Sequence, residues 1–313
     1  MGTSGSYGGP GGGTPLVPSW LGSGVGEGLA GPDAGTNASE GDQSTGGDAD
    51  GAAPSVSPGT VPSPSLPSAT AFSAAQAPPT LRRFTGGRGN FSRFARSGGS
   101  DRRSLGRAVS NHVSSASGGA ATAARRMGAS RGSGARLLGF LSDVRTRGVS
   151  AALEALNLQA LAGRSAQDVF LGLVDFVCPN GGTVDDGIAR EAFIETIVEL
   201  AEQGFPDLDA LTVDQMQTVF ELYATHAIEA RLCNDIGTNA IVLPASAQAV
   251  ANVEMQLRDF IKNGVADALA KAGDALQALT RENVLGFVDE VYQDAFRILL
   301  ALAEAEDDKD DDE

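Results

Sequence analysis

The residue best suited to chemistry in this sequence is Gly2. A residue as small as glycine after Met1 allows methionine aminopeptidase to remove the initiator, which would leave a free and unhindered α-amino group. An α-amino group titrates roughly 2.5 pH units below a lysine side chain, so far more of it is in the neutral, nucleophilic form near pH 7.5. No lysine precedes Lys262, and only Lys271 and Lys309 follow it. The sequence therefore offers an activated carboxylate one favoured acceptor, at Gly2.

Gly2 begins a leader, residues 1–21, that is too simple to fold alone yet contains an apolar island. Proline fixes φ and disfavours helix, so Pro15 and Pro18 favour an extended segment here. The Gly- and Ser-rich residues before the island are thin enough to enter an active-site tunnel. We therefore expect a short recognition segment, whose apolar island consists of Leu16, Val17, Trp20 and Leu21 and includes the only Trp of the chain.

Other reactive side chains do not form a catalytic pattern. His226 and His112 lack partners at the spacing of a zinc or nucleophilic site, and we interpret His226 as a helix-surface or interhelical polar contact. Cys178 and Cys233 form no CxxC motif and are expected to be buried, reduced thiols. Carboxylate pairs such as Asp185–Asp186 are common on acidic helices. We therefore expect a protein that is not an enzyme, with no metal or cofactor of its own.

Charge divides the chain into three blocks. Residues 1–80 contain six acidic residues and no Lys or Arg, and small residues supply most of the rest. This composition cannot bury enough apolar surface to offset the entropy of ordering, so we expect disorder in the leader and in a Gly/Pro/Ser linker at residues 22–80. Residues 81–147 carry a net charge of +12, and residues 148–313 a net charge of −22.

Residues 81–134 are expected to be a partly ordered, arginine-rich segment. Arginine interleaved with Phe suits phosphate contacts and base stacking. It equally suits docking onto an acidic protein surface, in this chain or in a partner, and the sequence leaves both alternatives open. The candidate residues are Arg82, Arg83, Arg88, Arg93, Phe94, Arg96, Arg102 and Arg103.

Residues 135–303 show helical spacing of apolar residues and no alternating run long enough for a sheet, which predicts an all-α domain. Capping patterns predict helices that begin after Ser165, Thr183, Thr212 and Ser246. Gly148 predicts a helix break, Gly264 and Gly273 predict a break or kink, and the last helix should begin near Thr280. Residues 304–313 are expected to be a disordered acidic tail. No apolar run approaches the ~20 residues of a membrane span and no secretory signal is visible, so a cytoplasmic protein is expected.

Three stretches also carry a resemblance to a known family. The leader, the segment NFSRFARSGGSDRRSLGRAVS and the stretch at residues 178–192 resemble the QatB components of bacterial Qat anti-phage defence systems. The resemblance covers the leader and residues 82 to about 269. It implies a non-enzymatic protein that works with a QatA-like ATPase, a QatD TatD-like nuclease and QatC, an enzyme similar to 7-cyano-7-deazaguanine synthase.

The resemblance also implies a reaction. Enzymes of that synthase class use ATP to adenylate the carboxylate of 7-carboxy-7-deazaguanine, and related defence operons conjugate a deazaguanine to protein. By this resemblance Gly2 would be the modified residue, and ATP and the deazaguanine would be used by the partner. The leader residues expected to contact the partner are Thr3, Ser4, Tyr7, Leu16, Val17, Trp20 and Leu21.

Two alternatives remain beside conjugation. One is an arginine-rich, nucleic-acid-binding adaptor that recruits the ATPase and the nuclease. The other is lipidation, because MGTSGS formally matches an N-myristoylation pattern. Lipidation carries little weight, since bacteria generally lack the transferase and no basic residue supports the leader.

Overall fold

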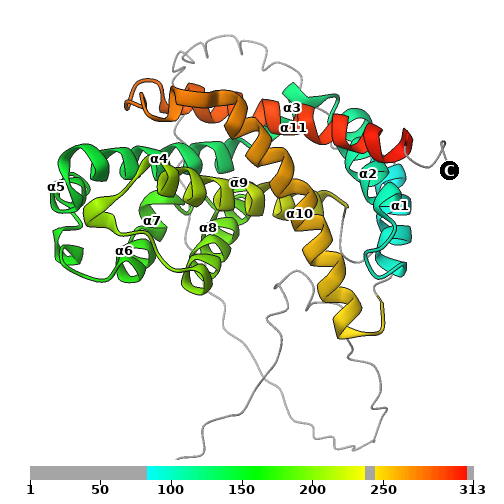
Figure 1. Ribbon diagram of the computed structural model, residues 1–313, viewed down its shortest axis with the longest axis horizontal. Coiled ribbons are helices and arrows are strands. Elements are labelled where there is room, and N and C mark those ends of the chain that lie inside the picture. Colours follow the sequence, from blue (N-terminus) through cyan, green and yellow to red (C-terminus); the bar gives the residue numbers. More distant parts are fainter. Residues whose placement is uncertain (1–82, 237–243, 309–313) are drawn as a thin grey trace, which may run out of the picture. The chain divides into compact units, whose positions relative to one another are not determined.

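The computed structural model describes residues 83–236 and 244–308 of the chain (Figure 1). Every regular element in these residues is a helix, which confirms the predicted all-α class. The leader, the linker and Arg82 lie outside the described residues, as do residues 309–313. The predictions for residues 1–80 therefore stay predictions.

The first helices form within the arginine-rich segment. The side chain of Asp101 caps the second of them by accepting a hydrogen bond from the backbone N–H of Ser104. Phe94 and Leu105 are fully buried in the same core as the later helices, so this segment belongs to the helical body. Its elements are α1 (Thr85–Arg96), α2 (Arg102–Ser110), the π-helix η2 (Asn111–Ala116) and α3 (Ala120–Arg126).

The helical body thus begins at Thr85, and the boundary expected after residue 134 falls inside α4 (Gly128–Arg147). The sequence concealed this start because Gly and Ser are frequent between the apolar residues of α1 and α2. Gly148 ends α4 as predicted, and its φ of 83° lies in the region that favours glycine. Two short elements follow, α5 (Val149–Glu154) and the 3₁₀ turn η3 (Gln159–Leu161).

The predicted caps are present in the middle of the chain. Ser165 caps α6 (Ala166–Gly172), and after α7 (Val174–Val177) a full capping box forms between Thr183 and Asp186. This box begins α8 (Val184–Gln203). Thr212 and Gln215 exchange hydrogen bonds at the start of α9 (Val213–Ile236), which follows the short turn η4 (Leu208–Ala210).

The last two long helices cross closely. Ser246 caps α10 (Ala247–Ala272) as predicted, but Gly264 neither breaks nor ends that helix. A Cβ at Gly264 would lie 2.8 Å from Cγ of Leu299 in α11, so this glycine is needed for close helix packing. The turn η6 (Gly273–Leu276) connects α10 to α11 (Val284–Asp308), which begins one turn after the expected start at Thr280.

Helix α11 is central to the packing of the body. It contacts α2, α3, α4 and α10, and Figure 1 shows it beside the first helices of the described chain. A Cβ at Gly106 in α2 would lie 3.2 Å from Cα of Ala303, so α2 and α11 approach almost backbone to backbone. On the other side of the body, α9 packs against α4, α8 and α10.

The expected disordered tail is wrong for residues 304–308, which continue α11. The physical reason is a charge contact that sequence proximity could not reveal. Asp307 accepts hydrogen bonds from Nε of Arg107 at 2.8 Å and from Nε of Arg103 at 3.3 Å, both in α2. Two arginines thereby offset an acidic residue at a helix C-terminus, where a negative charge is otherwise unfavourable.

No helix in the described residues is long and apolar enough to cross a membrane.

Candidate functional site

The arginines of the candidate basic segment fall into two groups. Arg93, Arg96 and Arg102 are exposed on α1 and α2. Arg83, Arg88 and Arg103 are partly buried. Nε of Arg88 donates to the carbonyl oxygen of Ile236 at 2.6 Å, and Arg103 contacts Asp307, so these two arginines hold the helices in place. The exposed group is available to contact an anionic partner.

The phenylalanines of the same segment are not available for base stacking. Phe94 is fully buried, Phe91 is almost so, and the two rings contact each other at a centroid distance of 5.7 Å. Phe84 is also buried and stacks on the ring of His112 at 5.8 Å. These aromatics are core residues. Arg103 and the neighbouring Arg107 form ion pairs with Asp307 of the same chain.

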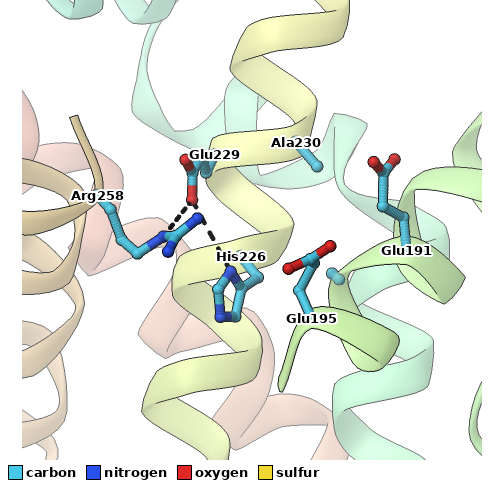
Figure 2. Close-up of a pocket in the computed structure, with 7 residues that line it drawn as sticks. Glu191, Glu195, His226, Glu229, Ala230 and Arg258 are labelled. Carbon is cyan, nitrogen blue, oxygen red and sulfur yellow. Dashed lines mark hydrogen bonds and ion pairs between the residues drawn. The ribbon is translucent and has the colours of Figure 1, made fainter. Parts of the chain in front are cut away.

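A second candidate site lies between α8, α9 and α10. His226 is only 4% exposed, and its Nε2 lies 2.8 Å from Oε2 of Glu199. Its Nδ1 lies 3.8 Å from Oε2 of Glu229, which accepts a hydrogen bond from Nε of Arg258 at 2.9 Å. Figure 2 shows His226 and Arg258 converging on Glu229 from two helices, with Glu191 and Glu195 approaching from α8. The predicted interhelical contact of His226 is confirmed.

The electrostatics of this cluster are consistent with a structural role. The hydrogen bond from His226 lowers the pKa of Glu199 below its ordinary value. Burial raises the pKa of Glu254 on α10 and of Glu221 on α9. The cavity beside His226 has a volume of about 20 Å³, which is room for about one water molecule. A cavity of this size leaves no space for a substrate.

The thiols and carboxylates also form no reactive centre in the described residues. Both cysteines are buried and free, as predicted, and Sγ of Cys178 donates to the carbonyl oxygen of Ala189 at 3.3 Å. Burial raises the pKa of Cys178 and, to a greater extent, that of Cys233, so little reactive thiolate forms. Within the same residues, no group of three or more His, Cys, Asp or Glu side chains could hold a metal ion.

A polar cluster that sequence reasoning missed surrounds His112 in η2. The ring is 3% exposed, and its Nε2 lies 3.7 Å from Oδ2 of Asp235 at the end of α9. Arg231 joins the cluster by contacting Asp235 at 3.0 Å and Asp185 at 2.6 Å. No local pattern could have revealed this cluster, because its members come from helices far apart in the sequence.

The sequence also did not reveal a larger pocket, which we name the α4 pocket. Its volume is about 470 Å³, within the usual range for ligand and peptide side-chain sites. Small residues of α4 line one wall. Apolar residues of α7, of α11 and of the turn after α5 line the others, and three charged residues complete the lining. The lining residues are Gly132, Ala135, Arg136, Gly139, Phe140, Asp143, Ala155, Leu156, Phe176, Arg281, Val284 and Leu285.

The lysines that the structure describes both lie near acidic side chains. Nζ of Lys271 lies 2.8 Å from Oδ2 of Asp294 in α11. Lys262 is partly buried in α10, and its charge acts on two nearby carboxyl groups. It adds to the lowering of the pKa of Glu199 and partly opposes the burial that raises the pKa of Glu221. Two of the three possible competitors of Gly2 are therefore held in a negative environment, while Lys309 and Gly2 itself lie outside the described residues.

Comparison with known proteins assigns the family. A family model described as Qat anti-phage system associated protein QatB matches residues 118–299, more than half of the chain. The match runs from the turn before α3 into α11, so it includes the His226 cluster and the α4 pocket but not α1 or α2. No curated protein and no solved structure matches the chain. The chain therefore belongs to the QatB family of proteins associated with Qat anti-phage systems.

Proposed function

We propose that this chain is a non-enzymatic component of its anti-phage system and the acceptor in a protein conjugation reaction, with Gly2 as the modified residue. The observation that carries the proposal is the distribution of amines in a chain of this family. The sequence contains one α-amino group and three lysines. Lys262 and Lys271 lie among carboxylates on the folded body.

In the proposed reaction this chain supplies only the amine of Gly2. A QatC-like partner would use ATP to convert the carboxylate of 7-carboxy-7-deazaguanine to an acyl adenylate and release pyrophosphate. The neutral amine of Gly2 would attack the acyl carbon, so that a C–N bond forms, AMP leaves and the amine gives up a proton. A lysine is a poorer nucleophile at neutral pH because nearly all of it is protonated.

The structural part of the proposal assigns separate roles to the leader and the body. Within the described residues of the helical body, no group of three or more His, Cys, Asp or Glu side chains could hold a metal ion, and His226 and Arg258 each pair with a carboxylate. Its role would be to hold the QatC-like enzyme, the ATPase and the TatD-like nuclease near the leader. Thr3, Ser4, Tyr7 and the apolar island would be gripped by the conjugating enzyme.

The experiment is intact-mass and N-terminal peptide mass spectrometry after co-expression with the neighbouring genes of the system. We expect loss of Met1 and an adduct on Gly2 that disappears when the QatC-like gene is omitted. Gly2→Leu should retain Met1 and lose the adduct, whereas the matched control Gly2→Ser should still lose Met1 and be modified. Lys262→Arg and Lys271→Arg should leave the adduct in place. An unmodified Gly2 in the presence of all partners, or an adduct on a lysine, would overturn the proposal.

A second candidate function, a nucleic-acid-binding adaptor for the ATPase and nuclease, is favoured by one observation. Arg93, Arg96 and Arg102 are exposed on adjacent helices and can contact phosphates, although the neighbouring phenylalanines cannot stack on bases. Changing all three arginines to Glu should weaken nucleic-acid binding strongly and reduce its salt dependence. Arg164→Glu, at an exposed arginine outside α1 and α2, is the control for a nonspecific change of charge. Equal binding by the triple variant and the wild type would remove this candidate.

A further inference from the structure

The α4 pocket is a largely apolar cavity on the described body. Phe140, Leu156 and Phe176 contribute apolar surface, and Leu285 at its edge is half exposed. A pocket of this volume with a mostly apolar lining and a few polar groups is typical of a binding site. The pocket has room for a large side chain, because the α4 wall is lined by the small residues Gly132, Ala135 and Gly139.

Gly139, at the centre of the α4 wall, faces open space. A Cβ added at Gly139 would meet no atom within 4 Å, although the residue lies in the middle of α4. Glycine costs a helix interior roughly 0.5–1 kcal/mol relative to alanine, so a glycine there without a close neighbour gains nothing from helix packing. Its benefit would be the open volume.

The rim of the pocket is charged, and two of its three charged residues are basic. Arg281 contacts Asp143 at 2.6 Å, and Arg136 donates to the carbonyl oxygen of Val177 at 2.8 Å. These contacts fix the two guanidinium groups beside an apolar cavity, in a chain whose net charge after residue 147 is −22. The site therefore suits an apolar segment with acidic residues next to it.

One segment of this chain has those properties. The island at Leu16, Val17, Trp20 and Leu21 is followed by six acidic residues and no basic residue up to position 80. Residues 22–82 join the island to the first described residue, and a Gly-rich chain of that length has a root-mean-square span of roughly 40 Å. A tether of this kind gives an effective concentration on the order of 1 mM or somewhat less, so a weak interaction is enough for binding within one chain.

We propose that the Leu16–Leu21 island of this chain binds in the α4 pocket of the same molecule, with the indole of Trp20 filling the cavity. The island can then bind either to its own body or to a conjugating partner, but not to both at once. Binding to the body leaves Gly2 on a free leader and withholds the residues that a partner would recognise. The site thus regulates when the leader is available. This inference stands on the pocket and the island and does not require conjugation at Gly2.

The test uses the only Trp of the chain as its reporter, in the purified full-length protein without partners. We expect Trp20 to emit at a shorter wavelength than in a synthetic peptide of residues 10–25, and to be quenched several-fold less by acrylamide. Gly139→Phe fills the cavity and should return both values to those of the peptide. Gly187→Phe is the matched control, since it also lies within a helix, has no atom within 4 Å of an added Cβ and is outside the pocket.

A second variant keeps the test decisive if Gly139→Phe does not fold. Leu285→Glu places a charge at the exposed edge of the pocket and should also expose Trp20, while circular dichroism verifies the fold. A wild-type Trp20 as accessible as the peptide would overturn the inference. So would a protected Trp20 that neither variant exposes. Protection that disappears on dilution would show that the occupant is the leader of a second molecule, and would overturn binding within one chain.

Discussion

The two histidines of the chain are both almost fully buried, yet their surroundings differ. His226 lies between Glu199 and Glu229, so each ring nitrogen faces a carboxylate oxygen. His112 has no hydrogen-bond partner at Nδ1, and its nearest acid, Asp235, is 3.7 Å from Nε2. Burial is the main reason that the pKa of His112 falls to about 4, and nearby Arg231 and Arg126 contribute.

The difference teaches that burial alone does not determine what a histidine does in this fold. The His226 cluster lies within the stretch matched by the family model, and three helices supply its partners. His112 precedes that stretch, in η2, where Phe84 stacks on its ring and Nδ1 has no hydrogen-bond partner. We therefore expect the N-terminal helices to add apolar stability with a pH-dependent cost, and the α8–α10 cluster to depend on its charge pairs.

The largest expected effect tests whether the N-terminal helices are an integral part of the core. Phe94→Ala should lower the free energy of unfolding by about 3–5 kcal/mol, because the side chain is fully buried and leaves a cavity. Urea unfolding of the full chain measures the loss. A cost below about 1 kcal/mol would mean that α1 packs only loosely, and the comparison of the two regions would fail.

The next effect concerns His112 and acid. The folded protein binds a proton at His112 only near pH 4, whereas the unfolded chain does so near the ordinary value of 6.5. Stability is therefore unaffected above about pH 6.5 and falls as the pH drops toward 4, by about 3 kcal/mol in total. His112→Gln should remove this part of the pH dependence. Urea midpoints at several pH values measure it, and an unchanged slope between pH 6.5 and 4 would contradict the prediction.

A smaller effect is expected when the charge pair of the second region is broken. Arg258→Leu leaves the buried carboxylate of Glu229 without its strongest donor and should cost about 1.5–3 kcal/mol. Thermal and urea unfolding measure the change. Arg164→Leu, at an exposed arginine, is the control and should have almost no effect. Equal stability of the Arg258 variant and the wild type would show that the pair is not needed.

The smallest effect sharpens the role of His226. Its hydrogen bond lowers the pKa of Glu199, so it contributes stability that is present above the ordinary pKa of 4.5 and is lost as the pH falls through the folded value. His226→Gln should move the pKa of Glu199 back toward 4.5. Carboxyl carbon titration by NMR measures this directly. A Glu199 pKa that stays low in the variant would assign its cause to Lys262 and Arg258 instead.

Local signals in the sequence predicted much of the fold. The caps at Ser165, Thr183, Thr212 and Ser246 each use a side chain three residues from its backbone partner, a relationship that a short window contains. The break at Gly148 was equally local. The helical body begins earlier than the sequence pattern predicts, at α1. Gly86, Gly87 and Gly89 lower the helix propensity of α1, and burial of its phenylalanines overrides that preference.

The sites were predicted less well because they depend on distant residues. His112 lies beside Asp235, and Arg107 contacts Asp307. The two residues of each pair are so far apart in the sequence that no periodic pattern predicts the contact. The α4 pocket results from four elements that leave a volume unfilled, and Gly139 has no sequence context that marks it as a pocket wall. The Arg/Phe pattern was ambiguous for a similar reason, since only packing decides whether Phe94 faces a nucleic acid or the core.

The close contact between α2 and α11 has a consequence for synthesis. The residues that join them, such as Arg107 and Asp307, are 200 positions apart. At roughly 5–20 residues per second, the ribosome needs about 10–40 s to make the intervening chain. During that time the face of α2 that packs on α11 has no final partner, although α1 is already present. Contacts of such long range also slow folding itself. The body is therefore expected to reach its native state only after α11 leaves the ribosome, which makes the nascent chain a candidate client for chaperones.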